Sequence, residues 1–301
     1  MAQTCSSVFG LIGFSGQPGR EAEILAFTAG LMPHYGDDWW MTSQYAFALC
    51  ETGNIEKADQ MIDRALAQRP RNAHGVHVRS HIWYEAGATE EGLSYLNTWL
   101  QDYENDGIMY SHLYWHAALW SLAQGETDAM WDRVDAAVSP ASGSTSPAIN
   151  ILTDTASILH RATLAGVAVD AERWKGVSAF ARQAFPATGN AFIDVHAALA
   201  HAMAGDNAAL EQIITRPAGP AADLVPDLAA GYRAMAAEDW SSAAGSMMRA
   251  MADLARIGGS RAQRDMVEQS LLTCLVKAGR AQEARDIASL RRPLLAESIA
   301  A

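Results

Sequence analysis

The sequence predicts an all-α solenoid of about six to seven antiparallel helix pairs. The first observation is a recurring turn signal, in which an apolar helical pattern stops and a second helical pattern follows after a polar pair. The second observation is composition, because alternating β-branched runs are missing and alanine, leucine, methionine, glutamate and glutamine dominate. We therefore expect more than about two-thirds helix and no significant sheet. The turn signals stand at Gly53, Gly87, Gly125, Gly166, Gly205, Asp239 and Gly279.

The first helical patterns in the sequence indicate the type of repeat. A helical pattern from about Arg20 to Pro33 is typical of the last helix of an incomplete repeat, so residues 1–35 are expected to cap the array. Two further patterns meet at Gly53, with small residues where antiparallel helices cross closely and a proline that closes the unit. This pattern predicts a tetratricopeptide-like α-solenoid. The small residues and the proline are Ala46, Ala58, Ala65 and Pro70.

The later elements repeat this unit with longer helices or loops. Successive turn signals are 34, 38, 41, 39, 34 and 40 residues apart, whereas a strict tetratricopeptide repeat has a period of about 34 residues. Two stretches rich in proline, glycine or serine, at 139–148 and 216–226, are expected to form long loops within the array. We therefore interpret residues 1–301 as a single helical-repeat domain.

Charge and composition argue against several classes of protein. The net charge of −12 would oppose binding to nucleic acid or to an anionic membrane. Three scattered cysteines suit neither a disulfide framework nor a CxxC zinc site, and they favour a reducing compartment. The N-terminal residues lack the basic and apolar regions of a secretory signal, and no apolar run approaches the ~18–20 residues of a membrane span. The expected location is the cytoplasm.

Histidines and carboxylates gather on the first helices of successive pairs. His77, His81 and Glu85 are spaced by four residues and therefore project from one helix face, which lines the concave groove. The next first helix carries a second such histidine pair, and two tryptophans lie beside the histidines. Later first helices add further polar residues. The candidate catalytic residues are His77, His81, Glu85, His112, His116, Asp154, Asp194 and His196, and the candidate ligand-binding residues are Trp83, Trp115, Arg261, Gln263, Arg264 and Asp265.

Three interpretations of this set stay open. Histidine pairs with a nearby carboxylate are suitable ligands for zinc or another divalent metal, and His77, His81, His112 and His116 are the candidate ligands. The segment between His77 and His81 lacks the glutamate of HExxH, so the zinc-protease motif is absent. The same groups could perform acid–base chemistry on a bound small molecule. They could also be structural, with each histidine tying neighbouring helices together through hydrogen bonds. Walker, GxGxxG and GxSxG motifs are missing from the sequence, which argues against nucleotide binding and serine hydrolysis.

Five blocks of this sequence, in order, resemble the tetratricopeptide repeat protein 38 family. GGSxAQRD is the most specific of them, and the resemblance extends from about residue 10 onward. It implies an α-solenoid of tetratricopeptide-like pairs and a bacterial member that is shorter at its N-terminus than typical members. It implies no reaction, but its blocks contain the polar residues named above. The blocks are HVRSHIWYEAG (77–87), HLYWHAALW (112–120), Asp154 with the LHR that follows it, NAFIDVH (190–196) and IGGSRAQRDMVEQ (257–269).

Two functions from different classes follow from these residues. The first is a groove lined by histidine, aspartate and glutamate that binds a small molecule or a metal and carries hydrolase- or lyase-type acid–base chemistry. The alternative is a non-catalytic scaffold that binds a protein partner in the groove. Scaffold grooves usually offer lysine, arginine and asparagine, so the residue types favour the first function. An incomplete first repeat would expose an apolar helix face, and this favours a homodimer.

Overall fold

The computed structural model describes residues 2–291 of the chain. Helices make up 74% of it and no strand occurs in these residues, which confirms the all-α prediction. Contacts divide the protein into two compact units. Unit 1 comprises the chain up to Asp154 together with Gly258–Ala262, and unit 2 comprises Thr155–Ile257 and the chain from Gln263 onward.

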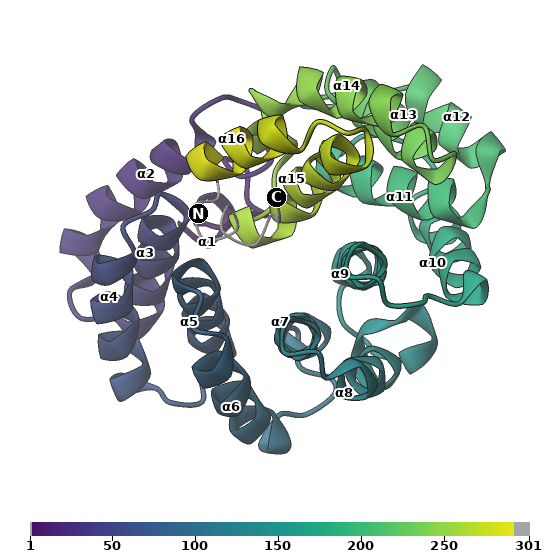
Figure 1. Cartoon of the computed structure of the whole chain (residues 1–301). Helices are drawn as coiled ribbons and strands as arrows, with labels where there is room; N and C mark the ends of the chain where they lie inside the picture. Colours follow the sequence, from purple (N-terminus) through teal and green to yellow (C-terminus); the bar gives the residue numbers. More distant parts are fainter. Residues whose placement is uncertain (1, 292–301) are drawn as a thin grey trace. The chain divides into compact units, whose positions relative to one another are not determined.

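The helices of each unit follow one another as pairs, labelled in Figure 1. Unit 1 contains α1 (Ala2–Ser6), α2 (Arg20–Tyr35), α3 (Trp39–Glu51), α4 (Ile55–Gln68), α5 (Ala73–Ala86), α6 (Thr89–Trp99), α7 (Tyr110–Ala123) and α8 (Thr127–Arg133). Unit 2 contains α10 (Ala171–Ala184), α11 (Ala191–Ala204), α12 (Asn207–Thr215), α13 (Val225–Ala236), α14 (Trp240–Met251) and α16 (Ala281–Arg291). Two helices begin in unit 1 and end in unit 2, namely α9 (Ala148–Leu164) and α15 (Arg261–Lys277).

Short helical turns and loops join these pairs. Of the two stretches expected as loops, the first contains a 3₁₀ turn at Pro140–Ser142 and then no regular structure until α9. The second consists of bends and turns until α13 begins. Other short segments are the 3₁₀ turns Leu100–Asp102 and Leu254–Ile257 and the π turn Val134–Val138. No helix in residues 2–291 combines the length and the apolar character needed to cross a membrane.

One hydrogen bond recurs at every turn that the sequence marks. At the first turn, Gly53 has φ +81°, and the N–H of Asn54 donates to the Leu49 carbonyl at 2.8 Å. This closure needs a left-handed residue, which glycine adopts without steric cost. At the sixth turn Glu238 takes that place with φ 57°. The equivalent donors at the other turns are Ala88, Glu126, Val167, Asp206, Asp239 and Arg280, at 2.8–2.9 Å from their acceptors.

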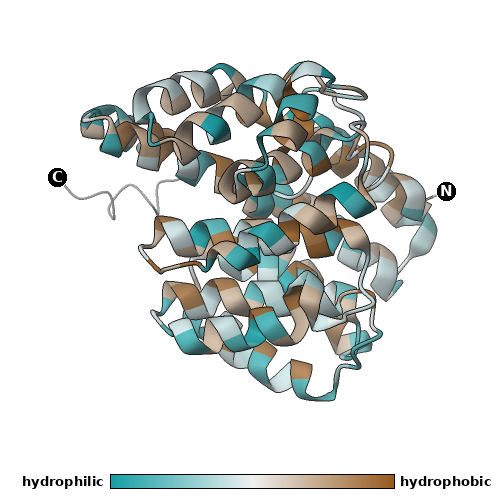
Figure 2. Ribbon diagram, turned by 90° about the vertical axis from the view of Figure 1, so that its right-hand side faces the viewer, coloured by the Kyte–Doolittle hydropathy of each residue, from teal (hydrophilic) through white to brown (hydrophobic). Residues whose placement is uncertain are grey.

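The packing order is the same in both units. In unit 1, α4 packs on α3 and on α5, and α3 also packs directly on α5. In unit 2, α12 packs on α11 and α13, and α11 packs directly on α13. These helices therefore pack against more than one neighbour, and Figure 2 shows both hydrophobic and hydrophilic residues along the helices. The alanines predicted at close helix crossings, Ala46, Ala58 and Ala65, are fully buried.

A matched pair of glycines tests the close packing of α6 on α7. A Cβ atom at Gly92 would lie 2.4 Å from Cη2 of Trp120, whereas a Cβ at Gly176 of α10 would have nothing within 4 Å. Gly92→Ala is expected to lower the free energy of unfolding by about 1–3 kcal/mol, because the indole must shift within a packed core. Gly176→Ala should raise it by roughly 0.5–1 kcal/mol through helix propensity alone. Urea unfolding of both variants measures the difference, and equal effects would contradict the close contact.

Candidate metal centre

Four histidines from two first helices come together in unit 1. His77 and His81 lie one turn apart on α5, and His112 and His116 lie one turn apart on α7. The four-residue spacing places each pair on one face of its helix. All four residues are buried, with between 0 and 6% of their surface exposed. Their ligand atoms all lie within 4.8 Å of one another, so the predicted histidines form one cluster.

Three Nε2 atoms of this cluster have the spacing of ligands around a single metal ion. Nε2 of His77 lies 2.8 Å from Nε2 of His81 and 3.1 Å from Nε2 of His112. Two nitrogens that are each ~2.05 Å from a metal lie about 2.9 Å apart at a right angle and about 3.3 Å apart in a tetrahedron. The ring of His116 packs against the others, with its centroid 4.7 Å from that of His81.

A buried carboxylate fixes the tautomer of one histidine. Nδ1 of His112 lies 2.8 Å from Oδ2 of Asp154, a residue that is fully buried at the start of α9. The carboxylate accepts the Nδ1–H, so that Nε2 of His112 presents a lone pair toward His77. Carboxylate–histidine pairs of this kind orient the imidazoles that bind metals and raise their basicity. Asp154 was among the predicted site residues, and the structure gives it this contact.

Protons alone cannot satisfy the three converging nitrogens. Each Nε2 carries either a hydrogen or a lone pair. Because Nε2 of His112 carries a lone pair, its contact with His77 needs a hydrogen on the His77 Nε2. That hydrogen cannot also be donated to His81. If Nε2 of His77 carries a lone pair instead, two lone pairs face each other across the 3.1 Å contact with His112. With neutral imidazoles one of the two short contacts is therefore not a hydrogen bond, whereas a cation between the rings would satisfy all three nitrogens.

The electrostatic surroundings favour the neutral form of His77 and His81. Burial, and then the neighbouring His81, His112 and His116, lowers the pKa of His77 well below its usual range. Burial, and then His112, lowers the pKa of His81 in the same way. Phe47 and Trp115 help to exclude water, since Phe47 lies 4.9 Å from the His81 ring and Trp115 stacks on His112 at 5.0 Å. Neutral imidazoles at pH 7 have the lone pairs that a metal requires.

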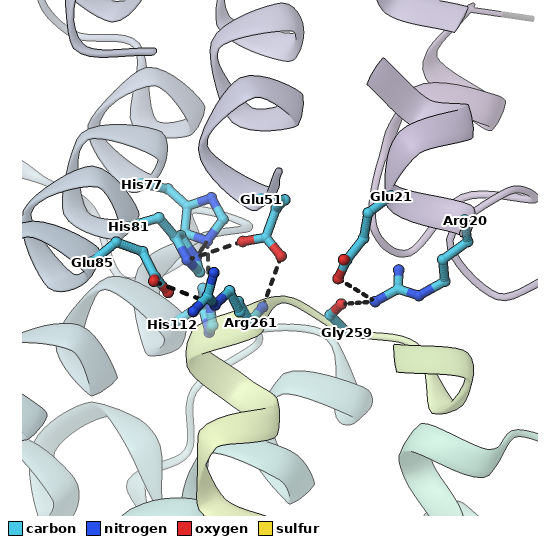
Figure 3. Close-up of polar contacts among 9 residues, drawn as sticks. All are labelled: Arg20, Glu21, Glu51, His77, His81, Glu85, His112, Gly259 and Arg261. Atoms are coloured by element: carbon cyan, nitrogen blue, oxygen red, sulfur yellow. Dashed lines mark hydrogen bonds and ion pairs between the residues drawn. The ribbon is translucent and has the colours of Figure 1, made fainter. Parts of the chain in front are cut away.

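Two glutamates and an arginine surround the other side of the cluster (Figure 3). Oε1 of Glu51 lies 3.8 Å from Nδ1 of His81. Oε2 of Glu51 accepts the backbone N–H of Arg261 at 2.7 Å, and Nε of Arg261 lies 3.4 Å from Oε2 of Glu85. Glu51 and Glu85 are nearly buried, whereas the Arg261 side chain is 34% exposed. Glu51 stands toward His81 much as Asp154 stands toward His112, although at a longer distance.

The segment Gly258–Ala262, here called the 258–262 strap, supplies Arg261 and is held to unit 1 at a second point. The guanidinium of the fully buried Arg20 donates to the carbonyl of Gly259 at 2.5 Å and lies 3.6 Å from Glu21. Gly258 has φ +100°, and a Cβ there would lie 2.6 Å from the Phe14 ring. The predicted residue Arg261 therefore reaches the cluster because the strap is bound at Gly259 and at the Arg261 backbone.

The remaining predicted residues have other surroundings. Trp83 of α5 is half-buried, with its ring 5.1 Å from that of Tyr95 and 5.2 Å from the Arg79 guanidinium. In unit 2, Asp194 accepts the N–H of Gly189 at 3.1 Å and Nδ1 of His196 donates to the Phe192 carbonyl at 2.7 Å. Three predicted residues are buried in the first turns of α15 within unit 2, namely Gln263, Arg264 and Asp265.

Sequence reasoning missed two groups at this centre, Glu51 and Arg20. A signal for Glu51 exists, because it precedes Gly53 by two residues as Glu85 precedes Gly87. Equivalent positions of successive repeats lie side by side, so the second glutamate was identifiable from the first. Arg20 offers no such signal, since its acceptor is a backbone carbonyl 239 residues away. No family model matches the chain.

Proposed function

We propose that the protein binds one divalent metal ion through Nε2 of His77, His81 and His112. The observation that carries the proposal is the trio of Nε2 atoms, 2.8 and 3.1 Å apart, whose contacts cannot all be hydrogen bonds. A cation between the rings would satisfy every lone pair at once. Nitrogen ligands without thiolates suit zinc best among the common divalent ions, and cobalt and nickel next.

The charge around the cluster supports a divalent ion. Asp154 lies 2.8 Å from Nδ1 of His112, and Glu51 lies 3.8 Å from Nδ1 of His81. Carboxylates behind ligating imidazoles raise the basicity of these ligands. They would therefore raise the affinity of the cluster for a cation.

A centre with three histidine ligands supports catalysis by a metal-bound water. Three protein ligands leave a coordination position open, and zinc in such a site lowers the pKa of its water to about 7. The ring of His116 packs against those of His81 and His112, so His116 would be the neighbouring base that could hold a proton beside such a metal. A cavity of about 10 Å³ beside Glu51, lined also by Glu21 and Phe47, has room for one water molecule. The proposed chemistry is metal-assisted hydrolysis or hydration.

A second candidate is a closed structural site in which His116 is the fourth ligand. It is favoured by the ligand atoms of all four histidines lying within 4.8 Å of one another. Four-coordinate zinc sites of this kind hold two elements together without chemistry. Here the metal would join α5 to α7.

Metal content tests the proposal directly. Protein purified after growth with zinc is expected to contain about one zinc per chain by elemental analysis, and the double variant His77→Ala/His112→Ala less than about one tenth of that. The exposed His34 provides a matched control, since His34→Ala should retain the metal. Wild-type protein that binds neither zinc nor cobalt would refute the metal centre and favour the scaffold function.

Two further variants in the same experiment separate the candidates. Asp154→Asn removes the carboxylate behind His112 and should weaken zinc binding by roughly 10–100-fold. His116→Ala should leave the affinity within about threefold if three histidines hold the metal, and reduce it at least about 100-fold if four do. Unchanged affinity in Asp154→Asn would contradict the role given to that carboxylate.

We also propose that the helix pairs are tetratricopeptide-like repeats, as the sequence predicts. The recurring turn hydrogen bond supports this, as does the packing of α3 on α4 and α5 and of α11 on α12 and α13. The family resemblance stays a prediction of the same kind.

A further inference from the structure

A separate cavity lies within unit 2, among α10, α11 and α12. Its volume is about 450 Å³, within the range of roughly 300–1,000 Å³ that is typical of small-molecule sites. Asp194, Ala197 and His201 line it at positions i, i+3 and i+7 of α11. These positions form one face of the helix, and the small Ala197 leaves space between the two polar groups.

His201 presents an unpartnered donor to this cavity. The residue is 4% exposed, and its Nδ1 lies 2.8 Å from the hydroxyl of Ser178, the one partner of the His201 side chain among the described residues. The Ser178 hydroxyl has no other acceptor in the described chain, so its hydrogen is best used on Nδ1. Nε2 of His201 then carries a hydrogen with no protein acceptor. Nε2 of His201 therefore offers its hydrogen to the cavity, where an acceptor on a bound molecule could take it.

Asp194 presents an acceptor at the opposite end. It is also 4% exposed, and the backbone N–H groups of Gly189 and Asn190 occupy only part of its hydrogen-bonding capacity, since a carboxylate accepts about four hydrogen bonds. Burial raises its pKa to about 6, so it is mostly ionised at pH 7.5. Seven residues of α-helix separate the Cα atoms of Asp194 and His201 by about 10 Å.

The remaining lining favours a molecule with one charge of each sign. Arg182 and Asp206 line the His201 end and form an ion pair at 2.5 Å. Arg216 adds a second positive charge and Asp194 a second negative one, so the cavity walls are neutral overall. Between the ends the lining is apolar, with Phe185, Ala197 and Ile213.

We propose that this cavity binds a short zwitterionic peptide of about three residues, with its ammonium group at Asp194 and its carboxylate at His201 and Arg182. An extended chain of three residues spans about 10 Å, which matches the separation of the two polar ends. The backbone and small side chains lie over the apolar floor at Ala197. This site is distinct from the metal centre of unit 1 and does not depend on it.

Calorimetric titration of the full-length protein with tri-alanine tests the proposal at pH 7.5. Tri-alanine is expected to bind with a Kd below about 1 mM, and N-acetylation or C-terminal amidation should each raise the Kd at least about tenfold by removing one charge. Single alanine, which cannot reach both ends, should bind at least about tenfold more weakly. Absence of binding by tri-alanine, or equal binding of the capped and free peptides, would overturn the proposal.

A steric variant locates the binding. Ala208 is an exposed residue of the cavity lining, so Ala208→Trp should fill the entrance and abolish binding while the protein stays folded. Ala171 is exposed at the start of α10 and lies outside the lining, and Ala171→Trp should leave the Kd within about twofold. Binding that survives Ala208→Trp would place the peptide elsewhere and overturn the assignment.

Discussion

Removal of the metal with a chelator is expected to lower the Tm of the holoprotein by about 8–16 °C. A ligand present at 1,000 times its Kd stabilises the folded state by about 4 kcal/mol, and each kcal/mol shifts the Tm of a protein of this size by roughly 2–4 °C.

Scanning calorimetry with EDTA, and then with zinc restored, measures this effect. His112→Ala is the matched control, because a protein that has lost its metal ligand should show no response to EDTA. A wild-type Tm that is unchanged by EDTA, in protein shown to contain zinc beforehand and none afterwards, would contradict the coupling between metal and fold. Recovery of the Tm on adding zinc shows that the change is reversible.

Acid is expected to unfold unit 2 between about pH 6.5 and pH 4. Burial lowers the pKa of His160 to about 3 and the pKa values of His196 and His201 to about 4. In the unfolded chain these histidines have pKa values near 6.5. Below that pH the unfolded state therefore binds protons that the folded state does not bind. The free energy of unfolding falls as the pH falls.

The size of this effect follows from the same pKa values. Each histidine lowers the free energy of unfolding by roughly 2–3 kcal/mol between pH 7 and pH 4, at about 1.4 kcal/mol per pKa unit. Asp194 opposes them, since its pKa is raised to about 6 and the folded state takes up its proton first. The destabilising effect of the three histidines exceeds the opposing effect of this one carboxyl group. The net loss is comparable with the whole stability of a typical domain, about 5–15 kcal/mol.

Urea unfolding followed by circular dichroism at several pH values measures the loss. The protein should be most stable above pH 6.5 and should lose its helical signal without denaturant near pH 4. His160→Gln removes one of the three titrating groups and should reduce the number of protons taken up on unfolding by about one. A free energy of unfolding that stays constant from pH 7 to pH 4 would refute the linkage.

The local features of this fold can be predicted from the sequence. The turn at Gly53 was predictable because an apolar helix that stops at a glycine commonly ends with that glycine in the left-handed conformation. The pairs His77/His81 and His112/His116 were predictable because a spacing of four residues decides which side chains share a helix face. Both inferences use interactions over a few residues, where periodicity is a sufficient guide.

Other features depend on distances that periodicity does not specify. His196 precedes its turn glycine by the same number of residues as His116 does, yet His196 bonds to its own helix at Phe192. Asp154 reaches His112 across 42 residues because of the way that the start of α9 packs within unit 1. Such pairings depend on how helices stack rather than on spacing within any one helix.

The 258–262 strap has a consequence for synthesis of the chain. Arg20 is made early and is fully buried in the finished protein, but its carbonyl acceptor at Gly259 emerges from the ribosome only after the first segment of unit 1 and about 100 intervening residues of unit 2. At a translation rate of roughly 5–20 residues per second, synthesis of these intervening residues of unit 2 alone takes about 5–20 s. During that interval the nascent unit 1 lacks the strap, and Glu51 and Glu85 lack Arg261. The N-terminal unit therefore completes its folding after synthesis of most of the C-terminal unit, whereas N-terminal domains usually fold first during synthesis.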